Sequence, residues 1–390
     1  MGCVCTKDNH QLELKNEFSQ YQIEIEEKFN NNLKLLKLLT KLQAIIKGRY
    51  VRNNLNKIEA KDEQLTYELI QTEIIPQEEL QEVFETYPPL DDGVEVEVRG
   101  PAQFSNKVIY FGEWDKVNNL RHGRGIQLWS DGAKFFGCWK KGKACGKGKL
   151  VHSDNDVYEG DWLDDKPCGY GIYLHSDGTK YEGEWKDDKR HGVGKVTTPL
   201  NYNFIGIYKN GSKNGLGYSF DNNRTMFGNF KENNIDGHAI IKYSNGDIYK
   251  GEVKNGNFEG YGIYKFSNGN EYEGEFKNSN KHGIGIFKFF YDEFDGDIFK
   301  GEFKDDKRNG IGTYISTNGF IYKGEAKDDL MHGYGEALQA NGEKDEGEFK
   351  YNQRIGYGKY TYPDGEVYER IFNDEPEEVD IVDLDDLFRG

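Results

Sequence analysis

Hydrophobic and charged residues alternate along short segments of this chain. In the segment YEGEWK, Tyr181, Gly183 and Trp185 alternate with charged residues, which is the period of two that a half-buried β-strand requires. A polar turn follows, and a second segment then opens with Gly192 and Gly194 and keeps the same alternation. The pattern predicts a β-hairpin with one aromatic face and one charged face.

The same hairpin pattern recurs along most of the chain. Tyr368 holds the start of a twelfth copy, in which Arg370 stands where the glycine belongs, and Gly100 lies where half a copy would precede the first. A nearly constant period of this length is typical of a repeat array with atypical terminal units. The core glycine occurs eleven times, at steps of 22 to 27 residues: Gly112, Gly137, Gly160, Gly183, Gly206, Gly228, Gly251, Gly274, Gly301, Gly324 and Gly347.

A second turn joins consecutive hairpins, and in most copies it carries an Asp-Gly or Asn-Gly dipeptide, which favours tight hairpin turns. The copy between Gly274 and Gly301 is four residues longer than most others, yet Asp295-Gly296 keeps the usual distance to the next core glycine. We therefore expect the extra residues to lengthen the return strand around Phe289 to Asp292. The other dipeptides are Asp131-Gly132, Asp177-Gly178, Asn245-Gly246, Asn268-Gly269, Asn318-Gly319 and Asn341-Gly342.

Glycines and large aromatic residues share one face of each predicted hairpin. Glycine leaves the backbone bare, so rings from neighbouring strands can lie across it and offset the usual cost of glycine in a strand. The expected product is a single-layer antiparallel sheet with a continuous twist. Aromatic residues that stand two places after the second glycine of G-x-G are Tyr173, Tyr264, Phe287, Tyr314 and Tyr360.

These residues together resemble the MORN repeat family (membrane occupation and recognition nexus), whose unit reads YxGxWxxxxxxGxGxxxxxxG. The resemblance covers roughly residues 106 to 372 and implies an all-β repeat array, an elongated, twisted single-layer antiparallel meander of β-hairpins. It also implies a scaffold, often dimeric or gripping a partner segment. Units that depart from the pattern at Asp345, Ala239, Ala326 and Val253 are expected to be looser.

The aromatic face is the first candidate binding surface. A single-layer sheet leaves this face uncovered unless it curves or another chain lies on it. We expect part of it to form a docking trough for a helical segment of a protein partner or for a second copy of the chain. The alternative is that every ring is core between neighbouring strands. The candidate residues are Tyr110, Trp114, Tyr158, Trp162, Tyr181, Trp185, Tyr264, Tyr272, Phe276, Tyr314 and Tyr360.

Composition excludes several classes of function. The net charge of −17 argues against nucleic acid as a partner, because neutralising phosphates requires clustered Lys and Arg. No run approaches 18 apolar residues, so no membrane-spanning helix is expected. Cys138, Cys145 and Cys168 fall at unmatched repeat positions, which indicates a reducing, cytosolic compartment.

No catalytic constellation stands out in the sequence. His122, His191, His282 and His332 each precede the first glycine of a G-x-G pair, but Cys and Asn fill the same slot in other copies. Residues that interchange in this way mark a turn position, and one repeat of separation is too far for a shared zinc ion. We expect no metal, no cofactor and no enzymatic activity.

The N-terminus begins MGCVCTKD, and Gly2 with Thr6 fits the N-myristoylation pattern. Cys3 and Cys5 stand where a myristoylated chain is commonly palmitoylated. A second acyl chain makes membrane residence stable, whereas one myristoyl chain gives only marginal attachment. The alternative is an ordinary frayed terminus with two free thiols. Acylation would place the chain on the cytoplasmic face of a plasma or ciliary membrane.

A basic amphipathic helix is expected over residues 28–58, where eight Lys or Arg occur without an acid. Within it, LQAIIKGRYVRNNL resembles the IQ motif, which implies binding to calmodulin or another EF-hand light chain. The helix could instead cap the end of the sheet or lie on anionic lipid. The residues that carry the resemblance are Leu42, Gln43, Ile46, Lys47, Gly48, Arg52 and Leu55.

The chain is therefore expected to comprise a lipidated N-terminus (1–27), the basic IQ-like helix (28–58), an acidic helical segment (59–92), the repeat sheet (93–372) and an acidic tail (373–390). Pro76 and the acids after it suit the first turn of a helix, which Pro88 and Pro89 would end. The tail is either solvated or a short docking segment.

Two functional classes fit these features. The first is a non-enzymatic scaffold or adaptor, tethered to a membrane by acylation and linked to calmodulin through the IQ-like helix. The second is a structural subunit of a ciliary axonemal complex, similar to a radial spoke, in which light chains decorate helices. Detergent distinguishes them, because it releases a membrane scaffold and leaves an axoneme intact.

Overall fold

The computed structural model describes residues 77–104, 107–290 and 296–372. This part of the chain contains helix α2 (Gln77–Thr86) and 24 strands that form one antiparallel sheet. The strands are β1 (Val96–Gln103), β2 (Ile109–Asp115), β3 (Arg121–Leu128), β4 (Lys134–Lys140), β5 (Lys143–Val151), β6 (Val157–Leu163), β7 (Lys166–Leu174), β8 (Lys180–Lys186), β9 (Lys189–Thr197), β10 (Asn203–Lys209), β11 (Ser212–Phe220), β12 (Arg224–Lys231), β13 (Asn234–Tyr243), β14 (Ile248–Lys254), β15 (Asn257–Lys265), β16 (Glu271–Lys277), β17 (Asn280–Lys288), β18 (Ile298–Lys304), β19 (Lys307–Ile315), β20 (Ile321–Lys327), β21 (Leu330–Leu338), β22 (Lys344–Lys350), β23 (Gln353–Thr361) and β24 (Val367–Phe372).

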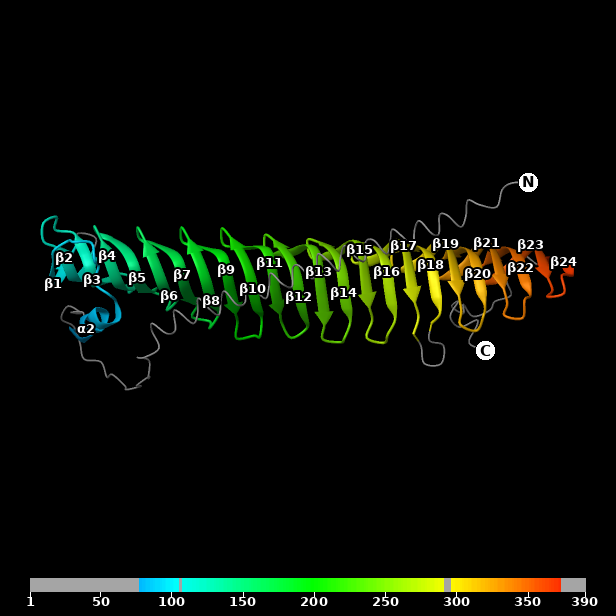
Figure 1. Ribbon diagram of the computed structural model, residues 1–390, viewed down its shortest axis with the longest axis horizontal. Helices are drawn as coiled ribbons and strands as arrows, with labels where there is room; N and C mark the ends of the chain where they lie inside the picture. Colours follow the sequence, from blue (N-terminus) through cyan, green and yellow to red (C-terminus); the bar gives the residue numbers. More distant parts are fainter. Residues whose placement is uncertain (1–76, 105–106, 291–295, 373–390) are drawn as a thin grey trace. The chain divides into compact units, whose positions relative to one another are not determined.

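The chain divides into two compact units. The first comprises Met1–Asn222 with Phe230–Asn233, and the second comprises Asn223–Asn229 with Asn234–Gly390. In the first unit, β1 to β11 pair in chain order, and in the second, β13 to β24 do the same (Figure 1). The predicted all-β antiparallel meander of hairpins is confirmed.

Each hairpin is organised around its glycines. The core glycine pairs with the second glycine of G-x-G, as Gly160 does with Gly171. The return strand carries a β-bulge between Cys168 and Gly171, just before this pair. In the bulge, Gly169 adopts a φ of +56° that a residue with a Cβ rarely accepts. The carboxylate of Asp161 accepts a hydrogen bond from the backbone N–H of Tyr170 at 3.0 Å. The acidic residue that follows the core glycine therefore satisfies a donor that the bulge removes from the ladder.

Two kinds of turn alternate along the sheet. Within a hairpin, two successive residues such as Asp164 and Asp165 have positive φ, as in a type I′ turn, which Asp, Asn and Gly tolerate best. Asp165 also reaches the preceding hairpin, where its Oδ1 accepts the N–H of Ala144 at 2.7 Å. Between hairpins, Gly132 takes a φ of +93° and closes the turn by donating its N–H to the carbonyl of Trp129. Turn side chains therefore add contacts between repeats beyond the strand ladder.

The four extra residues of the copy between Gly274 and Gly301 do not lie in the return strand, where the sequence analysis expected them. Strand β17 has nine residues, the same length as β15, so the return strand is not lengthened. Phe289 donates its N–H to the carbonyl of Asp297, and Gly296 donates to the carbonyl of Phe289. The insertion therefore belongs to the connection between β17 and β18. The expected lengthening was wrong because the connection absorbs the added residues without shifting the register of either strand.

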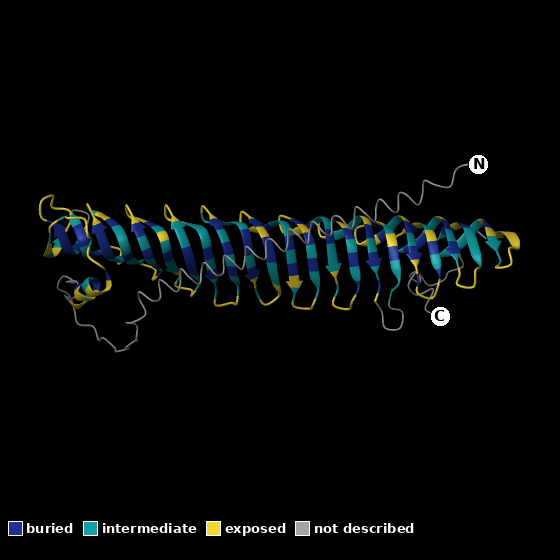
Figure 2. Cartoon of the chain, in the orientation of Figure 1, coloured by how far each residue is buried: buried dark blue, intermediate teal, exposed yellow. Residues whose placement is uncertain are grey.

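Single strands end the described array, as the half-copies in the sequence predict. Strand β1 pairs with β2 and places Arg99 opposite Gly112. Strand β24 pairs with β23 and places Arg370 opposite Gly358, in register with the glycine pairs of the complete hairpins. Figure 2 shows buried residues recurring along the strands of each unit, whereas exposed residues gather at the turns.

Helix α2 covers one face of the first strands. It ends at Thr86, before Pro88 and Pro89, in agreement with the prediction. Its residues Leu80 and Val83 are buried against Ile126 and Cys138, on the face opposite the aromatic one. The first unit therefore has a second, smaller apolar core between the helix and the sheet.

Candidate protein-docking face

The aromatic face is built from a repeated tyrosine contact. The ring of Tyr181 lies over the glycine pair of its own hairpin, and its hydroxyl donates to the backbone carbonyl of Glu184 at 2.9 Å. The same bond joins Tyr110, Tyr158, Tyr249, Tyr272 and Tyr322 to the carbonyl three residues later, at 2.6–3.0 Å. Burial raises the pKa of Tyr110, Tyr181, Tyr249, Tyr272 and Tyr322 above the usual range, because the phenolate would lose its hydration.

Edge-to-face contacts join successive hairpins. Tyr158 meets Trp162 of its own strand at a centroid distance of 5.2 Å and Trp185 of the next hairpin at 5.1 Å, with nearly perpendicular planes. Such pairs are worth about 0.5–1.5 kcal/mol beyond the area they bury. The indole Nε1 of Trp162 also donates to the carbonyl of Gly148 in the preceding hairpin at 3.0 Å. In the first unit this geometry repeats from Tyr110 to Phe230.

In the second unit, phenylalanine takes the place of tryptophan in these edge-to-face contacts. Tyr272 meets Phe276 of its own strand and Phe303 of the next hairpin at 5.1 and 5.0 Å. Where Asp345 replaces the leading aromatic residue, Arg354 lies over the glycine pair instead. Its guanidinium donates to the carbonyl of Glu348, the acceptor that a tyrosine would use. This substitution conserves the backbone hydrogen bond that the missing ring would have made.

The predicted face residues lie on one side of the sheet but are largely covered by one another. Most of the rings therefore form the core between neighbouring strands, and only part of the face is open. Trp185, Tyr264 and Tyr360 are half-buried. Those that are buried are Tyr110, Trp114, Tyr158, Trp162, Tyr181, Tyr272, Phe276 and Tyr314.

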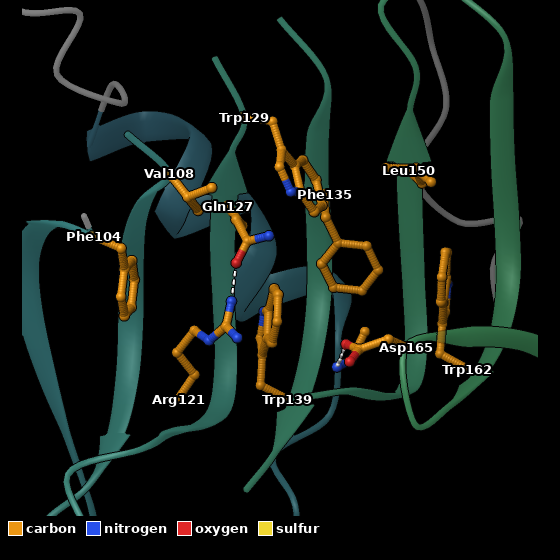
Figure 3. Close-up of a pocket in the computed structure, with 11 residues that line it drawn as sticks. Phe104, Val108, Arg121, Gln127, Trp129, Phe135, Trp139, Leu150, Trp162 and Asp165 are labelled. Carbon is orange, nitrogen blue, oxygen red and sulfur yellow. Dashed lines mark hydrogen bonds between the residues drawn. The ribbon is translucent and has the colours of Figure 1, made fainter. Parts of the chain in front are cut away.

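An aromatic groove of about 560 Å³ opens on this face in the first unit (Figure 3). Arg121 lies at its floor, with its guanidinium 4.3 Å from the ring centroid of Trp139 and hydrogen bonds to Gln127 and to the carbonyl of Gly142. Burial lowers the pKa of Arg121. Asp165 contributes a carboxylate to the lining. The remaining lining residues are Phe104, Val108, Trp129, Phe135, Ala144, Leu150 and Trp162.

This lining suits an amphipathic polypeptide better than a reacting substrate. Rings and aliphatic side chains line the groove together with polar groups, and Arg121 and Asp165 offer one charge of each sign. The lining residues include no Ser, Cys or His that could act as a nucleophile or base. The sequence had indicated Trp162, but not Arg121, Trp129 or Leu150, because these residues occupy positions that vary between copies.

The second unit has its own depression of about 510 Å³. Phe320, Phe349 and Tyr360 contribute rings, and Gln339, Asn341, Glu343, Asp345 and Asn352 contribute polar side chains. Its lining holds no tryptophan, whereas three tryptophans line the aromatic groove.

The remaining predicted sites lie outside the described residues or away from the groove. Gly2, Cys3 and Cys5, together with the IQ-like residues Leu42, Gln43, Ile46, Lys47, Gly48, Arg52 and Leu55, lie outside the described residues. In the part of the chain that the structure covers, no helix is long and apolar enough to cross a membrane. The same part holds no group of three His, Cys, Asp or Glu placed to bind a metal ion. His122 is buried and lies 3.2 Å from Asp92.

The MORN repeat family matches ten segments of the chain: residues 110–134, 135–157, 158–180, 181–199, 227–248, 249–271, 272–290, 299–320, 322–344 and 346–367. The unmatched hairpin of β10 and β11 nevertheless pairs Gly206 with Gly217, as the other hairpins pair their glycines. Together the matches cover more than half of the sequence.

Comparison with curated proteins gave no match. Two solved structures show a distant likeness. The SAS-4 (dCPAP) TCP domain of Drosophila melanogaster, in complex with a proline-rich motif of Ana2 (dSTIL), is 12% identical, with a TM-score of 0.23 over 45% of this chain and 86% of that domain. The TCP10 domain of Danio rerio CPAP, in complex with a STIL peptide, is 9% identical, with a TM-score of 0.24 over 70% and 98%. Scores this low carry no argument about function.

Proposed function

Because this chain belongs to the MORN repeat family, we propose that it is a non-enzymatic, membrane-tethered scaffold that docks a protein segment in its aromatic groove. MORN repeat proteins are in general repeat scaffolds for protein interaction. The single observation that supports docking is the groove itself, where Trp129, Trp139 and Trp162 line a hollow that also holds Arg121 and Asp165. Tryptophan and arginine are the residues most often responsible for binding energy at protein interfaces.

The occupant best suited to the groove is a helical segment of a partner, with a second copy of the chain as the alternative. Apolar side chains would enter between the rings, and a partner carboxylate would pair with Arg121. An uncompensated charge in this site would be costly, since Arg121 is already partly desolvated. The affinity is therefore expected to depend on an acidic residue in the docked segment.

Two further parts of the proposal concern the N-terminal region. We propose that Gly2 is myristoylated and Cys3 and Cys5 are palmitoylated, which would hold the chain at the cytoplasmic face of a membrane. We also propose that residues 42–55 bind calmodulin or a related EF-hand light chain through Leu42, Gln43 and Ile46, with Lys47, Gly48, Arg52 and Leu55 completing the motif. Both rest on the sequence motifs.

Groove docking is tested by affinity purification of the full chain from native cells, read by mass spectrometry. Replacing Trp129 and Leu150 with alanine should remove a specific set of partners, because both side chains line the groove and are half-buried. The matched control is Leu163→Ala, which removes an exposed leucine outside the groove lining. Equal recovery of all partners by the three proteins would refute docking at this site.

Tethering and light-chain binding need separate tests. Gly2→Ala should move the protein from the membrane fraction to the soluble fraction, and continued membrane residence would rule out acyl anchoring. Gln43→Ala with Arg52→Ala should weaken recovery of calmodulin from pull-downs with and without calcium. Resistance of the wild-type chain to detergent extraction would favour the axonemal alternative.

A further inference from the structure

A row of exposed apolar side chains crosses the sheet of the second unit on the face opposite the aromatic one. Each of the first four members is the middle residue of a G-x-G pair, and the fifth, Ile371, pairs directly with Tyr357 in the ladder. We refer to this set as the outer row. Its members and their exposed fractions are Ile284 (44%), Ile311 (67%), Tyr334 (61%), Tyr357 (58%) and Ile371 (83%).

The ladder makes the row continuous from β17 to β24. Ile311 lies opposite Glu325, and Tyr334 lies opposite Glu348, so acidic residues alternate with the apolar ones. Isolated exposed apolar residues are ordinary, but five that recur in line along one sheet face offer a surface for a covering element.

The first unit has a covering element at the equivalent positions. Arg124 is the middle residue of its G-x-G pair and lies opposite Cys138, as Tyr357 lies opposite Ile371. There α2 and the segment after it cover the row: Arg124 donates to the carbonyl of Phe84 at 2.9 Å and stacks over its ring at 4.7 Å. Cys138 is 2% exposed beneath the same segment. A short acidic helix thus protects this row at the start of the sheet.

The chain continues directly from the outer row into a segment with the same pattern. Around α2 the sequence has Pro76, then acids, and then apolar residues at Leu80, Val83 and Tyr87. After β24, Pro376 is followed by acids and by Ile381, Leu384 and Phe388, which share one side of a helix at spacings of three and four. The last described residue, Phe372, adjoins Ile371 of the row.

The length and the charge of residues 373–390 both permit contact with the outer row. The row spans seven strand spacings, or about 34 Å at ~4.8 Å each, whereas 18 extended residues reach about 60 Å and a helix of 13 residues is about 20 Å long. Residues 373–390 contain eight acids and one arginine. Lys300, Lys323 and Lys359 lie exposed on the same face, two residue pairs along the ladder from the row. Glu325 and Glu348 stand between the apolar members of the row, so the acids of a docked helix would lie toward these lysines at its border.

We infer that residues 376–388 fold as an amphipathic helix onto the outer row of the same chain, as α2 does at the start of the sheet. Ile381, Leu384 and Phe388 face Tyr334, Tyr357 and Ile371, and the helix covers this part of the outer row. This inference is independent of the groove and of its occupant.

The test is hydrogen–deuterium exchange of the full chain, read on peptides from residues 376–388. In the wild type, these amides should exchange at least about tenfold more slowly than an unstructured peptide of the same sequence. Tyr334→Asp with Ile311→Asp should remove that protection, and neither change threatens the fold because both side chains are exposed. The matched control is Leu200→Asp with Val117→Asp, two exposed residues outside the row that should leave exchange unchanged.

Three results would overturn the inference. Exchange of residues 376–388 at the rate of the free peptide would show that the row is not their docking site. Protection that appears only as protein concentration rises would assign the row to a second copy. Protection that survives both aspartates in the row would place the segment elsewhere.

Discussion

The ring of Tyr181 occupies the space where Gly194 would carry a side chain: a Cβ built on Gly194 stands 2.5 Å from Cε2 of the ring. The two residues lie on neighbouring strands, and the same relationship links the leading aromatic residue to the second glycine in most of the described hairpins. Glycine is thus required at this position by close packing. The backbone φ there is ordinary, unlike that of the first glycine of each G-x-G pair.

Gly194→Ala is therefore expected to destabilise the protein by about 1–3 kcal/mol, because the ring of Tyr181 must leave its place to admit a methyl group. Denaturant unfolding monitored by tryptophan fluorescence measures the change. Gly100→Ala is the matched control, since no atom lies within 4 Å of the added Cβ and φ is not positive. An equal decrease in the free energy of unfolding for the two variants would contradict the packing argument.

Asp329→Ala should lower the free energy of unfolding by about 2 kcal/mol, whereas Asp328→Ala should lower it clearly less. The carboxylate of Asp329 accepts from the backbone N–H of Arg308 at 2.8 Å and from its Nε at 3.1 Å, and Arg308 is 4% exposed. Both aspartates have positive φ, so any backbone penalty is shared. Thermal unfolding of the two variants isolates the side-chain contribution, and identical melting temperatures would refute it.

Asp156 is expected to contribute to stability against acid. The backbone N–H of Ser176, with Tyr173 and His175, lowers the pKa of the Asp156 carboxyl from 3.8 to about 2. A carboxyl whose pKa is lower in the folded state stabilises above its unfolded pKa and loses that effect as pH falls through the folded value. The melting temperatures of wild type and Asp156→Asn should therefore differ at pH 5 and converge near pH 2. A constant difference across this range would contradict the assignment.

Displacing α2 should make Cys138 reactive. Burial raises the pKa of this thiol to about 11, and its Sγ lies 3.6 Å from the carbonyl of Pro88. Val83→Asp places a charge in the core between helix and sheet, so maleimide should label Cys138 at least about tenfold faster. Peptide mapping separates this signal from Cys145, whose labelling serves as the control. An unchanged Cys138 rate would mean that α2 is not the cover.

The sequence by itself determined the repeat and its local geometry. Period-two alternation fixed which residues share a face, and the spacing of Gly183 and Gly194 fixed which glycines pair. Asp-Gly and Asn-Gly dipeptides fixed the turns between hairpins, because the glycine accepts the positive φ that the turn requires there. Pro76 and Pro88 fixed the limits of α2. These features depend on residues close together in the chain, where backbone geometry alone restricts the outcome.

Only the tertiary structure decided which side chains meet across hairpins. The role of Asp161 at the bulge, the substitution of Arg354 for a missing ring and the assembly of Arg121, Trp129 and Leu150 into a groove all depend on the register of neighbouring strands. The connection that absorbs the insertion after β17 shows the same dependence. The repeating pattern averages over positions that vary between copies, whereas packing acts on each of those positions separately.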